Sequence, residues 1–309
     1  MPKKSKNNSV KTSAIKKTGN KSFRGRWRRE KPQTPPEKLT GSFRLFADSL
    51  SVIRQYWKLF VGITLIYLIL SMLLVGGLGS LDVSELKKTF TEDLGQLSAS
   101  VAVFGLLIGS TGSAGSESGA AYQTIVVILV SLATIWSLRQ IYAGEKIGIR
   151  DAFYKGMFPL VPFVLVLLFL CLTLIPATIG SFIFTAVFGG ELAVTLVETL
   201  IWSIVVFLLM VASLYLLSTY IFAAYVVTLT DVRPVEAIKT ARKLARFRRW
   251  SILRKLLFLP VAYVAIGIIV ILPLIVFVPV VVQIVFVLLS MLALVFAHTY
   301  VYSLYKELL

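Results

Sequence analysis

The stretch 256–302 constrains this chain most, because its 47 residues include no charged side chain. One continuous α-helix of that length would run about 70 Å at roughly 1.5 Å per residue. The hydrocarbon core of a bilayer is only about 30 Å thick, so the stretch must fold back on itself. Pro273 and Pro279 mark the place. We therefore predict two membrane-spanning helices joined by a tight turn near 277–279.

The composition is that of a membrane protein. Hydrophobic residues make up 57% of the 309 and charged residues 15%, whereas soluble domains hold about 45–50% apolar and 25% charged residues. Cys171 is the only cysteine, which excludes an intrachain disulfide and a metal site built from several cysteines. The first apolar run begins near Trp57, which is too late for a cleavable signal peptide, so we expect it to be a retained signal anchor.

The apolar runs are spaced for six transmembrane helices. Besides the two spans within 256–302, four apolar runs are long enough to cross a bilayer: 58–78, 121–141, 158–188 and 199–228. Pro176 lies inside the third of these runs and should kink it. The stretch 99–120 contains too few apolar residues to cross the bilayer, so we expect it to be interfacial, re-entrant or extracytoplasmic. We predict an all-α polytopic membrane helix bundle over 41–309.

Residues 1–40 form a separate basic segment. It holds 13 Lys and Arg against Glu30 and Glu37, which gives a net charge of +11, and it has almost no aliphatic residues. A disordered arm is therefore expected, since the segment cannot bury enough surface to offset chain entropy. Lys and Arg also cluster after the second and fourth spans. The positive-inside rule then places both chain ends in the cytoplasm, and we expect a bacterial-type cytoplasmic membrane.

Amphipathic segments precede three of the spans. In 43–57, apolar side chains recur at spacings of three and four: Phe43, Phe46, Leu50, Ile53 and Trp57. This predicts a helix that lies either on the membrane surface or against the protein's own spans. Asp231 as cap and Pro234 in the first turn predict another helix, ending near 247. With 150–155 before the third span, the chain could repeat one unit three times, a surface helix followed by a two-span hairpin.

The segment 220–253 carries a resemblance to a known family. A span ends in an acidic residue at Asp231, a helix with alanines and basic residues follows at 234–244, and an Arg/Trp group at 248–250 opens the next span. This pattern resembles the polytopic membrane domain fused to some bacterial glycerophosphoryl diester phosphodiesterases, and that domain's stand-alone relatives of unknown function. The likeness extends loosely over 43–303. It implies a bacterial polytopic membrane fold, here without a soluble catalytic domain.

Residues with catalytic chemistry are scarce. A phosphodiesterase of that kind needs several histidines and carboxylates around a metal, but His298 is the only histidine. In Gly-Ser-Glu-Ser-Gly at 115–119, Glu117 stands where a hydrolase elbow has its serine, and no Gly-Lys phosphate loop occurs. We therefore expect a non-enzymatic protein without a cofactor or bound metal.

The basic loop after the fourth span carries the leading functional hypothesis. At helical spacing its cations gather on one side, which favours contact with anionic lipid headgroups, although such charges can also serve only to set topology. The candidate contacts are Lys239, Arg242, Lys243, Arg246, Arg248 and Arg249, with Trp27, Arg28 and Arg29 of the arm in support. The protein is expected to organise or regulate membrane lipids or protein partners at the inner leaflet.

Two alternative functions are compatible with the sequence. Gln283 and His298, both in the last span, could form an intramembrane polar site of a transporter or permease component. The arm interleaves aromatic residues with arginines over 23–29, a composition that also stacks on unpaired bases and neutralises phosphates. An RNA or ribosome tether is therefore the second alternative, beside an arm that is solvated and has no dedicated partner.

Overall fold

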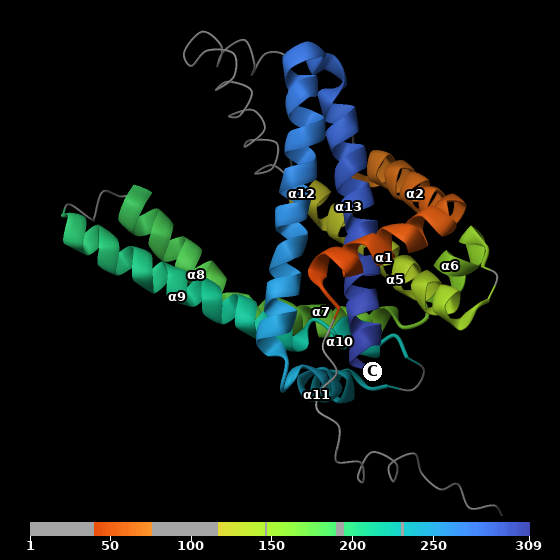
Figure 1. Cartoon of the computed structure of the whole chain (residues 1–309), viewed down its shortest axis with the longest axis horizontal. Helices are drawn as coiled ribbons and strands as arrows, with labels where there is room; N and C mark the ends of the chain where they lie inside the picture. The colour runs from red at the N-terminus through yellow and green to blue at the C-terminus, as the bar shows by residue number, and fades with distance from the viewer. Residues whose placement is uncertain (1–39, 76–116, 146, 190–194, 230–231) are drawn as a thin grey trace, which may run out of the picture. The chain divides into compact units, whose positions relative to one another are not determined.

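The computed structural model describes residues 40–75, 117–145, 147–189, 195–229 and 232–309, all within one unit of the chain. The secondary structure of these residues is helical (Figure 1). The elements are α1 (Ser42–Gln55), α2 (Trp57–Val75), α5 (Glu117–Ala143), α6 (Ile149–Gly156), α7 (Leu160–Thr173), α8 (Ile175–Phe184), the π-helical turn η2 (Thr185–Gly189), α9 (Leu196–Tyr220), α10 (Ala223–Val226), α11 (Pro234–Ala245), α12 (Arg249–Phe277) and α13 (Pro279–Leu308).

The described helices confirm a multi-pass membrane protein. Five of them are long and apolar enough to cross a bilayer, and α6 with α7 makes a sixth if that bent pair is counted as one span. The five are Trp57–Leu74, Gly119–Ala143, Val197–Val226, Arg249–Phe277 and Pro279–Leu308. They agree with the predicted all-α bundle of about six transmembrane helices.

The hairpin of α12 and α13 turns where the sequence predicted. Val278 breaks the helix at φ −141° and ψ 69°, and Pro279 begins α13, where its missing N–H costs nothing because a first-turn N–H has no intrahelical partner. Pro273, expected to help end the first span, instead lies inside α12 together with Pro260. The two helices run antiparallel over a long distance (Figure 1). Near the turn their contact consists of Ile271, Ile275, Val282 and Phe286.

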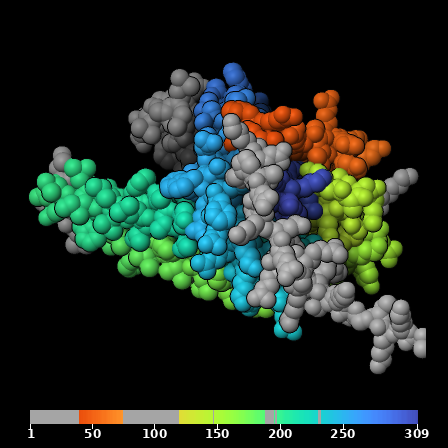
Figure 2. All heavy atoms as spheres, turned by 60° about the horizontal axis from the view of Figure 1, so that its bottom comes forward, coloured from red at the N-terminus to blue at the C-terminus, as the bar shows by residue number. Residues whose placement is uncertain are grey.

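The third predicted span, 158–188, is divided rather than merely kinked. α7 ends at Thr173, and α8 begins with Pro176 in its first turn. The proline ring clashes with the carbonyl of Leu172, four residues earlier, and offers no N–H to it, which explains the break. α8 then packs along α9 (Figure 2), where Gly180 lets the side chain of Leu209 approach closely. On the other side α7 meets α6 at 73°.

Three short amphipathic helices, α1, α6 and α11, each precede a helical hairpin in the chain. Each is held to the bundle by residues buried at a spacing of four: Leu45 and Ser49; Ala152 and Gly156; Ala237, Ala241 and Ala245. α1 packs on α13, α6 on α5, and α11 on α7, α9 and α10. In the described chain each of these helices is followed by a pair of helices that pack on each other, α2 on α5, α8 on α9 and α12 on α13, while the threefold repeat and the membrane-surface position stay predictions.

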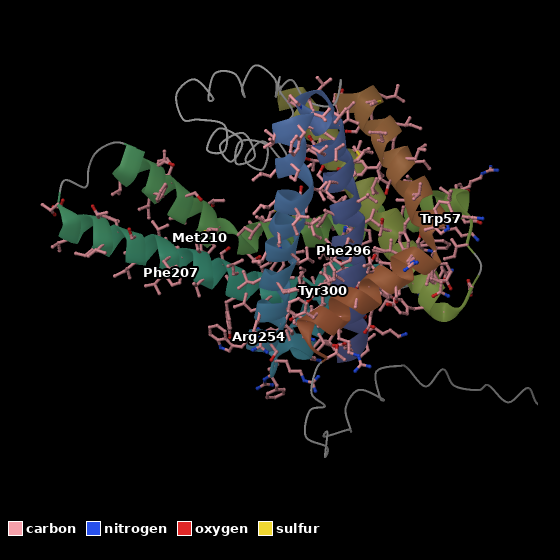
Figure 3. The ribbon with its side chains drawn as sticks, turned by 45° about the horizontal axis from the view of Figure 1, so that its top comes forward. Trp57, Phe207, Met210, Arg254, Phe296 and Tyr300 are labelled. Atoms are coloured by element: carbon pink, nitrogen blue, oxygen red, sulfur yellow. The ribbon has the colours of Figure 1, made fainter. Side chains whose placement is uncertain are left out.

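The predicted stripe of the first helix is only partly buried. α1 packs on the protein's own α13 through Leu45 and Ser49, with Phe46 against Phe296 at a ring separation of 4.7 Å (Figure 3). Other residues of the stripe, including Leu50, stay exposed. Residues 1–39 of the arm, the stretch 76–116 and the proposed cap Asp231 lie outside the described residues. Of the stretch 99–120, expected not to cross, only 117–120 are described, and they belong to α5.

Candidate membrane-surface site

The basic loop forms the helix α11, and its sequence explains why. Pro234 stands in the first turn, where its fixed φ suits a helix start and its missing N–H is not needed. Glu236 lies in the same turn and the cations Arg242 and Lys243 lie in the last one, so both ends complement the helix dipole. The helix ends at Ala245, two residues before the predicted end.

One face of α11 is fixed against the bundle. Ala237, Ala241 and Ala245 are fully buried, and their small side chains let the backbone of α11 lie close to α7, α9 and α10. Because this face cannot rotate outward, the residues opposite it are held in a constant orientation. These exposed residues are four of the predicted contacts: Lys239, Arg242, Lys243 and Arg246.

Exposed aromatic rings adjoin these cations where α11 turns into α12. Phe247 is 83% exposed and Trp250 is 71% exposed. The guanidinium of Arg246 lies 5.4 Å from the centre of the Phe247 ring, a cation–π contact. Arg254 follows one turn into α12 and is also exposed (Figure 3). Cations together with a tryptophan at the start of an apolar span are typical of a membrane–water interface.

Arg249 differs from the other predicted contacts, because the protein itself engages it. Its Nη1 donates a hydrogen bond of 2.6 Å to the hydroxyl of Tyr215 in α9, and its guanidinium lies 5.3 Å from that ring. Its buried Nε has no hydrogen-bond partner among the described residues. Arg248, at the N-cap of α12, is half-buried. Arg249 therefore helps hold α12 against α9, while the three cations of α11 and its C-cap Arg246 are exposed.

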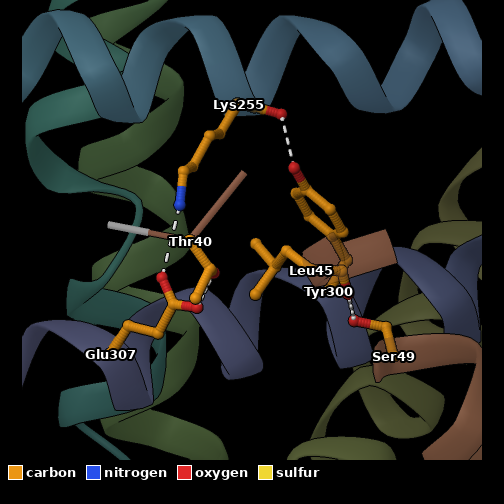
Figure 4. A network of polar contacts seen from close by, with 6 residues as sticks. All are labelled: Thr40, Leu45, Ser49, Lys255, Tyr300 and Glu307. Atoms are coloured by element: carbon orange, nitrogen blue, oxygen red, sulfur yellow. Dashed lines mark hydrogen bonds and ion pairs between the residues drawn. The ribbon is translucent and has the colours of Figure 1, made fainter. Parts of the chain in front are cut away.

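A buried ion pair lies nearby that the sequence did not indicate. Lys255 and Glu307 are 5% and 22% exposed, and Lys255 Nζ lies 3.3 Å from Glu307 Oε2 (Figure 4). Thr40 donates a hydrogen bond to the other carboxylate oxygen, and the Tyr300 hydroxyl donates to the Lys255 carbonyl at 3.2 Å. The network joins Thr40, two residues before α1, to α12 and to the end of α13. In the sequence Lys255 is indistinguishable from its solvated basic neighbours.

The two residues of the predicted intramembrane polar site are not brought together. Gln283 precedes His298 by 15 positions on the same helix, which corresponds to roughly 22 Å at about 1.5 Å per residue. His298 instead joins three helices: its Nδ1 lies 3.1 Å from the Tyr225 hydroxyl of α10, and its Nε2 lies 2.9 Å from the Ser131 hydroxyl of α5. Both ring nitrogens are thus within hydrogen-bonding distance of the protein's own side chains.

The remaining predicted contacts, Trp27, Arg28 and Arg29, lie outside the described residues. Within the described ranges, no group of three or more His, Cys, Asp or Glu side chains is placed to hold a metal ion. No protein-family model, curated protein or solved structure matches this chain. The resemblance to the phosphodiesterase-fused membrane domain stays a prediction.

Proposed function

We propose that this membrane protein binds anionic phospholipid headgroups at the inner leaflet through α11, and that it thereby organises or regulates lipids there. One observation carries the proposal. The buried alanine face of α11 holds its four outward cations in a fixed orientation, directly beside the exposed rings of Phe247 and Trp250 at the start of a transmembrane helix. This combination of charge and aromatic surface suits a headgroup layer better than bulk water.

The size of the effect follows from the number of exposed cations. A Lys or Arg near an anionic membrane surface gains about 1 kcal/mol, so the four cations of α11 together supply about 4 kcal/mol at low salt. The attraction falls off within a Debye length, about 8 Å at physiological ionic strength. Only a helix held close to the membrane surface gains this electrostatic attraction. α11 meets that condition because it leads directly into the apolar helix α12.

The competing explanation is that these charges only orient the protein during insertion. The two explanations differ in what happens after insertion, because a purely topological role requires no preference for anionic lipid. Lipid selectivity of the inserted protein therefore separates them. It can be measured with the protein in nanodiscs, from the association of spin-labelled phosphatidylglycerol relative to spin-labelled phosphatidylcholine.

The informative variant changes Lys239, Arg242, Lys243 and Arg246 together to Gln. We expect its preference for phosphatidylglycerol to fall strongly, and to fall also for the unchanged protein when salt is raised. The matched control changes an equal number of arm cations to Gln: Lys3, Lys4, Lys6 and Lys11. It removes the same net charge and should keep most of the preference. Protease accessibility of the arm must show the same orientation in both variants.

Equal lipid preference in the α11 variant and in the unchanged protein would refute the proposed lipid role. Mass spectrometry of the protein in native-lipid particles adds a second check. Retained anionic lipid supports the proposal, whereas a stoichiometric protein that comes with the complex would indicate a partner-binding role for the same face. The transporter alternative gains no support from Gln283 and His298, which lie apart on α13, and the arm on which the RNA-tether alternative depends lies outside the described residues.

A further inference from the structure

Exposed aromatic residues recur at all three junctions between a surface helix and the transmembrane helix that follows. Trp57 is the first residue of α2 and is 56% exposed, Phe158 lies between α6 and α7 and is 90% exposed, and Trp250 is the second residue of α12. The α11 site accounts only for the last of these. Trp57 and Phe158 lie next to α1 and α6, which have no part in the proposed function.

The chain changes direction at each junction. Tyr56, between α1 and α2, departs from helical geometry at φ −109° and ψ 31°. α6 and α7 are bent by 73° relative to each other. Arg248, between α11 and α12, has φ −130° and ψ 17°. The axis of each short helix therefore differs from that of the apolar helix that follows it, and the exposed ring lies near the bend between the two.

The side of α1 next to its buried face shows what such a helix contacts. Phe43 and Leu50 are seven positions apart in α1, so they lie along one edge of that helix, and Trp57 begins α2 just past the bend at Tyr56. All three are exposed, although the Phe43 ring also touches Phe258 at a centroid distance of 5.0 Å. Leu45 faces the bundle instead. No described part of the protein covers this apolar edge.

Exposed cations accompany every one of these rings. Arg54 and Lys58 flank Trp57, Lys155 lies one turn before Phe158, and Arg246 and Arg254 lie on either side of Trp250. A water-exposed surface would not explain the rings, and the hydrocarbon core would not accept the cations. The layer that takes both is the headgroup and carbonyl region of a bilayer.

We propose that the three junctions are membrane-surface contacts of one kind, each with its exposed ring in the headgroup and carbonyl layer of the bilayer. α1, α6 and α11 then lie along that surface while α2, α7 and α12 enter the hydrocarbon core. This inference does not depend on a preference for anionic lipid, because burial of the rings operates equally in a neutral bilayer. It extends the membrane contact from α11 to all three surface helices.

The test measures depth with tryptophan fluorescence in phosphatidylcholine vesicles whose chains carry bromine at a shallow or a deep position. The background protein has every Trp changed to Phe: Trp27, Trp57, Trp136, Trp202 and Trp250. Single reporters are then the restored Trp57, the restored Trp250 and Phe158→Trp. Phe207→Trp is the deep control, since Phe207 is exposed and lies about 15 Å into its span at roughly 1.5 Å per residue.

We expect the ratio of shallow to deep quenching to exceed one for all three junction reporters and to fall below one for the Phe207→Trp control. A junction reporter that resembles the control, or that neither lipid quenches, would overturn the inference. If the background protein does not fold, nitroxide labels at the same four positions in a Cys171→Ala background give the same depths from oxygen and nickel accessibility. Because the vesicles are neutral, the outcome is independent of the lipid-selectivity experiment.

Discussion

Changing Glu307 to Gln should destabilise the protein by about 3–5 kcal/mol, because it leaves the ammonium of Lys255 buried without its carboxylate. Gln has nearly the shape of Glu and keeps an oxygen that can accept the hydrogen bond from Thr40. The change therefore removes one charge and little else. Lys255 cannot relax into water easily, since only 5% of its side chain is exposed.

The geometry of the pair sets the size of the effect. At 3.3 Å and an effective dielectric constant of about 20, two unit charges attract each other by about 5 kcal/mol. Burying the two ions costs several kcal/mol each, so the intact pair contributes little net stability compared with an apolar pair. The loss in Glu307→Gln is mainly the cost of the isolated Lys255 charge. The double variant Lys255→Met with Glu307→Gln should therefore recover most of it.

Steric trapping in lipid bicelles measures the free energy of unfolding of the three proteins. The chain also supplies a matched control, the exposed ion pair of Lys155 and Asp151, whose charged atoms are 3.6 Å apart. Asp151→Asn should cost at most about 0.5 kcal/mol, since exposed pairs at this helical spacing contribute little. If Glu307→Gln lowers the free energy of unfolding no more than Asp151→Asn does, an unpaired Lys255 charge is not costly and the prediction is wrong. A double variant as unstable as the single one would also contradict it.

Three further substitutions test the packing by the same unfolding measurement. Gly156→Ala should cost about 1–3 kcal/mol, because its new Cβ would lie 3.2 Å from the Cα of Ala133 and push α6 off α5. Gly41→Ala has open space and should cost no more than about 0.5 kcal/mol, from the loss of a glycine at the N-cap of α1. Thr195→Ala should cost about 1 kcal/mol and speed amide exchange in the first turn of α9, because it removes a capping box. Ser131→Ala removes one hydrogen-bond partner of the only histidine and should cost about 0.6–1.7 kcal/mol; no loss would mean that the bond does not stabilise the bundle.

Features that depend on neighbours in the sequence were predictable. The fold-back at Pro279 follows from bilayer thickness and from a proline that starts a helix more easily than it continues one. The start of α11 at Pro234 and its outward cations follow from local capping and from helical periodicity. Pro176 was correctly expected to disturb its helix, but the sequence did not indicate that the helix would stop and restart there.

Features that depend on a distant partner were not predictable. Lys255 and Arg249 stand in the same basic run as the exposed cations, and only the positions of Glu307 and Tyr215 show that they are engaged. His298 was a plausible functional residue until the structure gave its nitrogens protein partners on two other helices.

The sequence by itself therefore determined that the chain is a multi-pass helical membrane protein, where it turns back, and which helices carry a charged face. These properties follow from bilayer thickness, proline geometry and helical period, all of which act along the chain. Only the tertiary structure decided which cations are free to meet a membrane surface. A buried ion pair and a solvated charge have the same local sequence, and they differ only in what packing brings beside them.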